Sequence, residues 1–219
     1  GFGNVNGVMH DADGASAQCS ADLLIAYGQL FAAIPAFFPA PLLGNGQTLN
    51  AGVYSIFGGA TLNGNLILDA QNDPSAVFIF QLEGAFSTAA QSSVQLVNGA
   101  QACNVFWKVE GLVDMATGTY MVGTVVANNA AIILNSGTTL EGRALSTTGA
   151  VTVHDVLAYI PSGCGKPLLK GPDVPALGAV ECYGIFSGDG PVSNSGITTI
   201  NGDVGTNVGL TTGFDPLLV

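Results

Sequence analysis

Charged side chains are scarce in this sequence, and basic ones are the scarcest. Among 219 residues there are 4 Lys and Arg against 15 Asp and Glu, which gives a formal net charge of −11. A protein that neutralises phosphates needs clustered Lys and Arg, so the shortage excludes nucleic-acid binding and argues against docking on a membrane surface. The longest apolar segment, residues 30–43, is interrupted by prolines and is too broken to span a bilayer.

Motifs for catalysis and metal binding are also missing. His10 and His154 are far apart and in no metal-ligand spacing, and neither a Gly-x-Ser-x-Gly elbow nor a phosphate-binding loop is present. The carboxylates are scattered singly, whereas glycoside cleavage needs a pair of them. We therefore expect no enzyme, no cofactor and no metal, with a polysaccharide-active enzyme as the alternative.

The four cysteines are Cys19, Cys103, Cys164 and Cys182. An even number without a Cys-x-x-Cys pair fits disulfides in a secreted, extracellular protein better than a zinc site. Three pairings are possible. We favour Cys164–Cys182, which closes a short loop, and Cys19–Cys103, which ties a helix to the body. Buried free thiols are the alternative.

One helix is predicted at about residues 15–34. Asp11, Asp13 or Ser16 can cap its start, and Pro35 ends it. Apolar residues recur at helical spacing and predict one stripe that packs against the rest of the protein. That stripe consists of Leu23, Leu24, Tyr27, Leu30, Phe31 and Ile34.

Beyond Gly46 the sequence consists of short apolar runs separated by Gly, Asn, Ser and Thr. Several corners repeat small residues, an apolar residue and then x-Gly, ending at Gly64, Gly123, Gly142 and Gly202. Gly142 follows Gly123 by 19 residues, and Gly123 follows Gly64 by 59, close to three such steps. Such short strands cannot support a free sheet, but stacked coils let each pair above and below. A mainly β solenoid is therefore favoured over a β-sandwich.

We expect a single domain over residues 1–219. The stretch at about 161–180 is rich in Pro and Gly and is interpreted as a connector. Residues 181–219 return to the pattern of strands and corners, so they are expected to rejoin the solenoid.

Thr, Ser and small residues recur at comparable phases of the repeat. On stacked coils they would form a level ladder of hydroxyls and methyls with almost no charge. Such a surface orders its first water layer instead of binding charged solutes. The alternative is that Thr and Ser are common here because they suit strands and corners.

The sequence resembles the β-solenoid ice-binding (antifreeze) proteins of sea-ice bacteria, diatoms and snow fungi. The resemblance covers residues 66–81, 97–109, 141–145, 148–152 and 195–205, including Asp-Ala-Gln-Asn-Asp-Pro-Ser-Ala-Val-Phe-Ile-Phe-Gln and Asn-Gly-Ala-Gln-Ala-Cys-Asn-Val-Phe-Trp. It implies a right-handed, three-faced β-helix with one long α-helix packed alongside. It also implies a cofactor-free monomer that adsorbs to the ice crystal surface, giving thermal hysteresis and inhibiting recrystallisation.

The family binds ice on a flat face with a Thr-Ala/Gly-x-Thr/Asn pattern. Carried over, the resemblance predicts the ice-binding residues Thr61, Thr88, Thr117, Thr119, Ser136, Thr138, Thr139, Thr148, Ser195 and Thr198. We expect tyrosine at Thr138 or Thr198 to reduce thermal hysteresis while the melting temperature stays nearly intact. An adhesin or carbohydrate-binding module is the alternative function, with Tyr120, Tyr159 and Tyr183 as its aromatic candidates.

The order of the segments departs from the family. The segment that resembles Ser195–Gly205 comes before the helix in the family and comes last here. Gly213-Phe214 also echoes Gly1-Phe2. This order predicts a circular permutant, or one frame cut from a tandem array, with Gly1 and Val219 close together.

Overall fold

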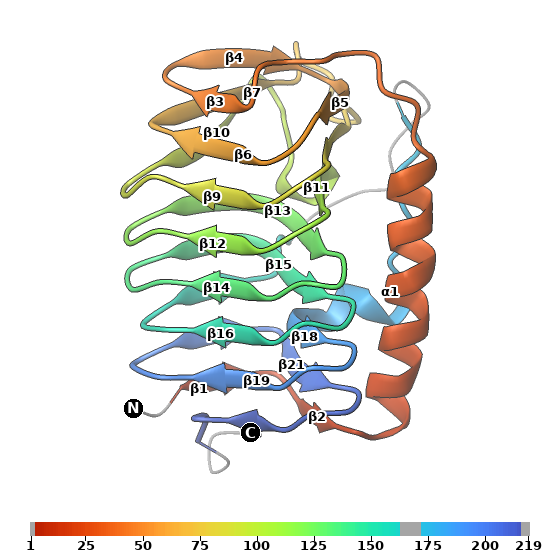
Figure 1. The fold of residues 1–219 in the computed structure, drawn as a ribbon, viewed down its shortest axis with the longest axis vertical. Coiled ribbons are helices and arrows are strands. Elements are labelled where there is room, and N and C mark those ends of the chain that lie inside the picture. Colours follow the sequence, from red (N-terminus) through yellow and green to blue (C-terminus); the bar gives the residue numbers. More distant parts are fainter. Residues whose placement is uncertain (1–2, 163–171, 216–219) are drawn as a thin grey trace.

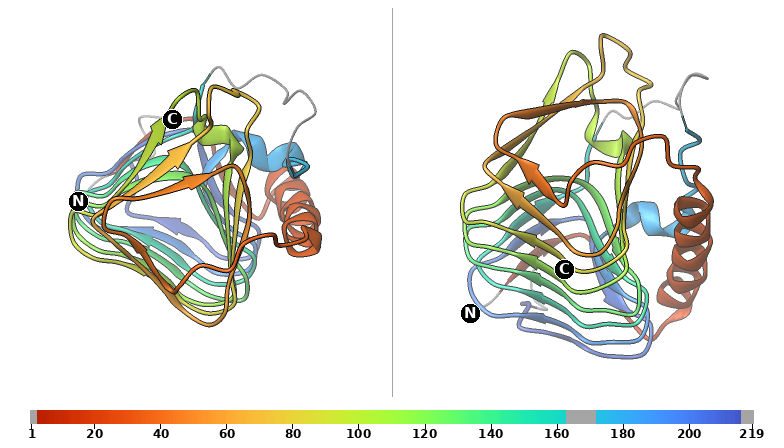
Figure 2. Two further views of the ribbon diagram at one scale, coloured as in Figure 1. Left: turned by 90° about the horizontal axis from the view of Figure 1, so that it is seen from above. Right: turned by 45° about the horizontal axis from the view of Figure 1, so that its top comes forward.

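The computed structural model describes residues 3–162 and 172–215, which form a stack of β coils with a helix alongside (Figure 1). Seen from above, the coils outline a triangle, and the helix lies outside one side of it (Figure 2). The strands form one 14-stranded and one 8-stranded sheet in which neighbours are parallel. The predicted mainly β solenoid is confirmed, and the β-sandwich alternative is wrong.

The three sides of the triangle are named faces A, B and C. Face C is formed by β3 (Leu42–Gly44), β6 (Ala60–Asn63), β9 (Phe86–Thr88), β12 (Val113–Met115), β14 (Ile132–Leu134), β16 (Val151–Val153), β19 (Val192–Asn194) and β22 (Thr211–Thr212). Face A is formed by β4 (Gln47–Asn50), β7 (Asn65–Asp69), β10 (Ser93–Val97), β17 (Leu157–Tyr159), β20 (Thr199–Asn201) and β1 (Asn4–Asn6).

Face B is the side next to the helix. It is formed by β5 (Gly52–Ile56), β8 (Phe78–Leu82), β11 (Val105–Val109), β18 (Tyr183–Ser187), β21 (Asp203–Thr206) and β2 (Met9–Asp11). Two longer strands, β13 (Tyr120–Ala127) and β15 (Thr139–Ser146), cross the corner and belong to both A and B. The short 3₁₀ helices η1 (Ala102–Asn104) and η2 (Gly178–Cys182) precede β11 and β18.

Glycine is required where β13 and β15 cross the corner between faces A and B. Gly123 has φ +102°, and a Cβ on the paired Gly142 would lie 1.9 Å from the Gly123 carbonyl oxygen. Gly202 connects β20 to β21 at the same corner. Gly64, however, connects β6 to β7 at the corner between C and A. It therefore does not occupy the same place in the repeat as the other three glycines, and the predicted equivalence was wrong.

The inward side chains form one apolar column along the axis of the stack. Near the top it is aromatic: Tyr54 stacks on Phe80 with centroids 5.1 Å apart, and Phe80 stacks on Trp107 at 4.0 Å. Trp107 is fully buried and donates its indole N–H to the Val122 carbonyl at 2.9 Å, so its polar atom is satisfied. The three rings stack because Tyr54, Phe80 and Trp107 are paired at the same register position on neighbouring strands.

Helix α1 (Gly14–Ala32) confirms the predicted helix and begins at the Asp13 cap. Asp13 accepts from the Ser16 backbone N–H at 2.8 Å, and this bond, with His10, lowers the pKa of Asp13 to about 2. The predicted stripe is only partly right. The buried residues are Ser16, Cys19, Leu23, Ala26 and Leu30, whereas Leu24, Phe31 and Ile34 are exposed, because α1 rests on face B along a narrower line.

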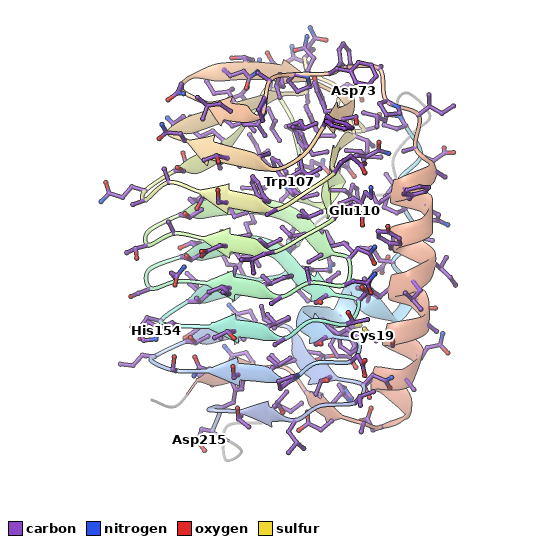
Figure 3. The ribbon with its side chains drawn as sticks, viewed as in Figure 1. Cys19, Asp73, Trp107, Glu110, His154 and Asp215 are labelled. Carbon is purple, nitrogen blue, oxygen red and sulfur yellow. The ribbon has the colours of Figure 1, made fainter. Side chains whose placement is uncertain are left out.

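Lys108 is the centre of a polar cluster between face B and α1. Its ammonium is fully buried and lies 3.0 Å from Glu83 and 2.9 Å from Glu110. Glu110, on the helix side in Figure 3, also accepts from the Tyr27 hydroxyl at 2.6 Å and from Asn128 at 2.8 Å. A buried charge requires such partners, so this cluster fixes the helix against the solenoid.

Both favoured disulfide pairings are wrong. Cys103 is disulfide-bonded, but Cys19 on α1 and Cys182 at the end of η2 are free thiols. Neither Cys19–Cys103 nor Cys164–Cys182 is therefore formed, and Cys164 lies outside the described residues. Cys19 packs in the buried face of α1, where burial raises the pKa of its thiol.

The two ends of the described chain meet in one coil. β1 pairs with β20 and β2 with β21, while β22 pairs with β19. Gly3 donates to the Gly213 carbonyl at 2.8 Å, and Asp215 donates to the Gly3 carbonyl at 2.9 Å. Gly1 and Val219 lie outside the described residues, so their closeness and the permuted order stay predictions.

The second half of the expected connector runs along α1. Ala176 donates its backbone N–H to Gln29 at 2.6 Å, and Ala179 donates to Asp22 at 2.7 Å. After η2 the strands β18 to β22 continue the same stack. Residues 163–171 of the connector lie outside the described part.

Glu110 is predicted to make the protein acid-sensitive. Burial opposes its ionisation, but the donors Asn128, Tyr27 and Lys108 outweigh burial and lower its pKa. Its stabilisation is therefore full above the unfolded pKa of about 4.3 and is lost as the pH falls through the lower folded value. We expect Glu110→Gln to cost about 1–3 kcal/mol at pH 7 and to melt closer to wild type at pH 3.

Thermal melts followed by circular dichroism between pH 2.5 and 7 measure this difference. Glu83→Gln is the matched control, since it also removes a partner of Lys108 but lies on the more exposed side of the cluster. Identical pH profiles for wild type and Glu110→Gln would contradict the assignment.

Candidate functional site

The three faces differ in what they offer to solvent. Face B is covered by α1, whose buried residues pack on Val53, Ile79 and Phe106. Face A is stepped, because β10 pairs with β13 at a single position, Ser93 with Tyr120. Face C is uncovered, and its strands stack as one series (Figure 1). Face C is therefore the only level sheet surface that the described residues leave open.

A single outward column runs down the middle of face C. Strand alternation buries the flanking residues and turns the central one outward, as in Val151-Thr152-Val153. The paired central residues are Leu42, Thr61, Ser87, Asp114, Ile133, Thr152, Ser193 and Thr212. All eight lie in unbroken register, so they are spaced by the ~4.8 Å repeat of the sheet.

Small side chains accompany this column. Two positions before the central residue stand Ala40, Gly59, Ala85, Ala131 and Ala150 in five of the eight coils, all at least partly exposed. Such side chains leave the hydroxyls and methyls of the column accessible. The exceptions are Leu112, Pro191 and Leu210 at the same position in other coils.

Neighbouring coils are joined by hydrogen bonds along the surface. The hydroxyls of Thr61 and Ser87 lie 3.1 Å apart, and Ser193 donates to Thr152 at 3.4 Å. The carboxylate of Asp114 accepts from Asn135 at 2.8 Å, which holds this charge within the surface. These contacts fix the side-chain rotamers before any ligand arrives, which lowers the entropic cost of binding.

Four of the ten predicted residues border this surface. Thr61 belongs to the central column of face C. Thr117, Ser136 and Ser195 lie on the corner that leads from C to A, and Thr117 and Ser195 are exposed there. His154 shares this corner and lies 2.9 Å from the Ser195 hydroxyl. Figure 3 places His154 at the edge of the stack.

Four others are buried, so they cannot contact a surface. Thr88, Thr119, Thr138 and Thr198 are at most 7% exposed. Their hydroxyls bond inside the corner: Thr119 donates to the Ala116 carbonyl at 2.7 Å, and Thr198 accepts from Val156 at 3.1 Å. Tyrosine at Thr138 or Thr198 would therefore disrupt the corner, so we now expect it to lower the melting temperature, contrary to the expectation from the sequence.

The remaining two lie elsewhere. Thr139 belongs to face A, where it pairs with Tyr120 and Leu157. Thr148 is exposed on the opposite corner, between B and C, where it donates to Asn129 at 3.4 Å. The predicted set is thus divided among two faces, two corners and the interior.

The predicted set of ice-binding residues leaves out four hydroxyl residues of the central column: Ser87, Thr152, Ser193 and Thr212. A signal for one of them was present, because Thr152 stands between two valines that a strand must bury. A hydroxyl residue between two apolar residues therefore indicates an outward position on face C better than a Thr-Gly-x-Thr pattern does.

Comparison with known proteins agrees with this architecture. A family model described as ice-binding-like matches residues 1–157. The chain belongs to this family. An ice-binding protein of Nostoc sp. (strain HG1) is 39% identical over 150 residues, which cover 68% of this chain and 55% of the relative.

Two crystal structures of proteins named as ice-binding are similar to the chain. An ice-binding protein from an Antarctic Flavobacteriaceae bacterium is 62% identical, with a TM-score of 0.74 over 98% of this chain and 51% of that protein. One from the Antarctic ascomycete Antarctomyces psychrotrophicus is 32% identical, with a TM-score of 0.64 over 71% of this chain and 87% of its own.

The chain spans about half the length of the Nostoc and Flavobacteriaceae relatives. Within residues 3–162 and 172–215, no helix combines the length and the apolar character needed to cross a bilayer.

The corner threonines are predicted to act on stability, unlike those of face C. Thr198→Val leaves the Val156 N–H without its acceptor, so we expect a loss of about 1–3 kcal/mol in the free energy of unfolding. Thr152→Val, on an outward position, should change it by no more than ~0.5 kcal/mol. Urea denaturation of the two variants measures both values, and equal losses would contradict the assignment of inward and outward positions.

Proposed function

We propose that this chain is an ice-binding protein and that face C, with the adjoining corner from C to A, is its ice-binding surface. The observation that carries the proposal is the unbroken register of the central column, in which small uncharged side chains predominate. Membership of the ice-binding-like family supports it, as do relatives that are themselves named ice-binding proteins.

The mechanism follows from the regular spacing of the column. Hydroxyls of Thr61, Thr152 and Ser193 hold water at fixed points, and the neighbouring methyls and alanines leave that water no competing partner. Water held in rows at the sheet repeat offers a growing crystal a layer that it can incorporate. Once adsorbed, the protein pins the front, so growth must curve between pinned sites, which lowers the freezing point below the melting point.

Many weak contacts share this binding, so area and flatness matter more than any single residue. Asp114 and Ile133 interrupt the row of hydroxyls near the middle of face C. The bond from Asn135 to Asp114 reduces the tendency of that carboxylate to attract disordered water. We infer moderate activity that rests on the coils on both sides of this interruption.

The protein acts by adsorption and not by catalysis. Glu83 and Glu110 both pair with the buried ammonium of Lys108, so this carboxylate pair is held in a structural ion-pair cluster and is not a free acid and base for a glycoside. It acts as a monomer with ice as its partner, outside the cell, and the disulfide at Cys103 supports an oxidising compartment.

Bulky side chains on face C should abolish adsorption. We expect Thr152→Tyr to reduce thermal hysteresis markedly, and the triple variant Ser87→Tyr, Thr152→Tyr, Ser193→Tyr to remove most of it. The reason is steric, because each ring lifts the ordered water layer off the surface. Nanolitre osmometry measures the hysteresis, and a recrystallisation assay gives a second readout.

Thr199→Tyr is the matched control, since it places the same ring at a partly exposed threonine on face A. It should leave hysteresis and melting temperature unchanged. Loss of activity in this control with retention in the triple variant would move the ice-binding surface to face A. A wild-type protein with neither hysteresis nor recrystallisation inhibition would refute the proposed function.

A further inference from the structure

Face A contains a groove that the ice-binding proposal does not use. After the pair Ser93–Tyr120, which stands at the start of both strands, β10 separates from β13. The reason is that the segments after β7 and β10 reach out beyond the rest of the triangle (Figure 2). The separation leaves a groove of about 610 Å³. Ser93–Val97 lines one side, and Tyr120, Val122 and Glu141 line the other.

The second side of the groove carries a hydrogen-bonded cluster of two phenols and a carboxylate. Tyr120 donates to Glu141 Oε2 at 2.7 Å, and Tyr159 lies 3.5 Å from the same oxygen. The two hydroxyls are 3.3 Å apart. Burial, followed by the bonds to Tyr159 and Glu141, raises the pKa of Tyr120, so its hydroxyl stays protonated.

This cluster leaves hydrogen-bonding capacity for a ligand. Glu141 Oε1 accepts none of the bonds found among the described residues, and a carboxylate oxygen can accept two. Gln95 is exposed beside the groove and offers both a donor and an acceptor. Tyr120 is 36% exposed, and Leu96 and Val97 are only partly buried. The groove therefore combines apolar walls with a few convergent polar groups, which is typical of small-molecule sites.

The chemistry favours an uncharged sugar. A pyranose has an apolar face of C–H groups, which fits the ring of Tyr120, and a rim of hydroxyls, which fits Glu141 and Gln95. Anions are disfavoured by the net charge of −11. Arg143 and Lys108, the cations in the strands nearest to the groove, are buried on face B.

We propose that the groove between β10 and β13 on face A binds a sugar residue of a neutral polysaccharide. Because faces A and C are separate sides of the triangle, one molecule can hold both ligands at once. The protein would then be retained by a glycan matrix while face C stays free. This proposal does not depend on ice binding.

Affinity electrophoresis through gels containing laminarin, dextran, galactomannan or alginate tests it. We expect retardation by at least one of the three neutral polysaccharides and none by the acidic alginate. Glu141→Gln, which removes the charge-assisted acceptor, should weaken retardation severalfold. Tyr120→Ala, which removes the ring, should abolish it.

Thr199→Val, elsewhere on face A, is the control and should be retarded like wild type. Thermal melts and thermal hysteresis should be unchanged in Glu141→Gln, which separates loss of sugar binding from loss of folding or of ice binding. The proposal is overturned if no neutral polysaccharide retards the wild type, or if Glu141→Gln and Tyr120→Ala are both retarded normally. Retardation by alginate alone also overturns it.

Discussion

The parallel backbone ladder between coils is the constraint on which the other features depend. Strands of two to five residues make up most of the walls, and each satisfies its N–H and C=O groups only through the coils above and below it. Every coil must therefore bring equivalent residues to equivalent places. The corner devices serve this end: Gly123 and Gly142 stack where no Cβ fits, and buried hydroxyls such as Thr198 bond the backbone of the neighbouring turn.

The same ladder gives two open faces of different character. On face C each coil contributes a strand of similar length, so the outward residues align in one level column. On face A the ladder continues from β7 to β10 but is nearly interrupted before β13, so a step and a groove result. Face B is closed by α1 through apolar contact and the buried Lys108. A flat sheet and a concave groove thus arise from one architecture by a change in local register.

Sequence could predict the solenoid, the helix and the family, because repeated corners and long matching segments do not depend on side-chain direction. It could not predict which hydroxyls face outward, because the corners differ in length. Asn135-Ser136-Gly137 fills a corner where the next coil has only His154-Asp155, so a pattern aligned on Thr-Gly-x-Thr slips between coils. The alternation of inward and outward residues along a strand, as at Thr152 between two buried valines, indicated the outward hydroxyls more reliably.

The height of the stack accounts for the helix and for the meeting of the chain ends. The eight strands of face C span ~34 Å at ~4.8 Å per step. The 19 residues of α1 extend ~28 Å at ~1.5 Å each, so the helix and the following residues 33–41 carry the chain from the β2 coil to the β3 coil.

The chain then winds back until β22 meets the coil of β1 and β2, where the Thr211 hydroxyl donates to Asp11. Because each coil contacts only its neighbours, a coil assembled from both ends has the same backbone partners as a continuous one. The helix therefore both closes face B and returns the chain, and it leaves faces A and C uncovered.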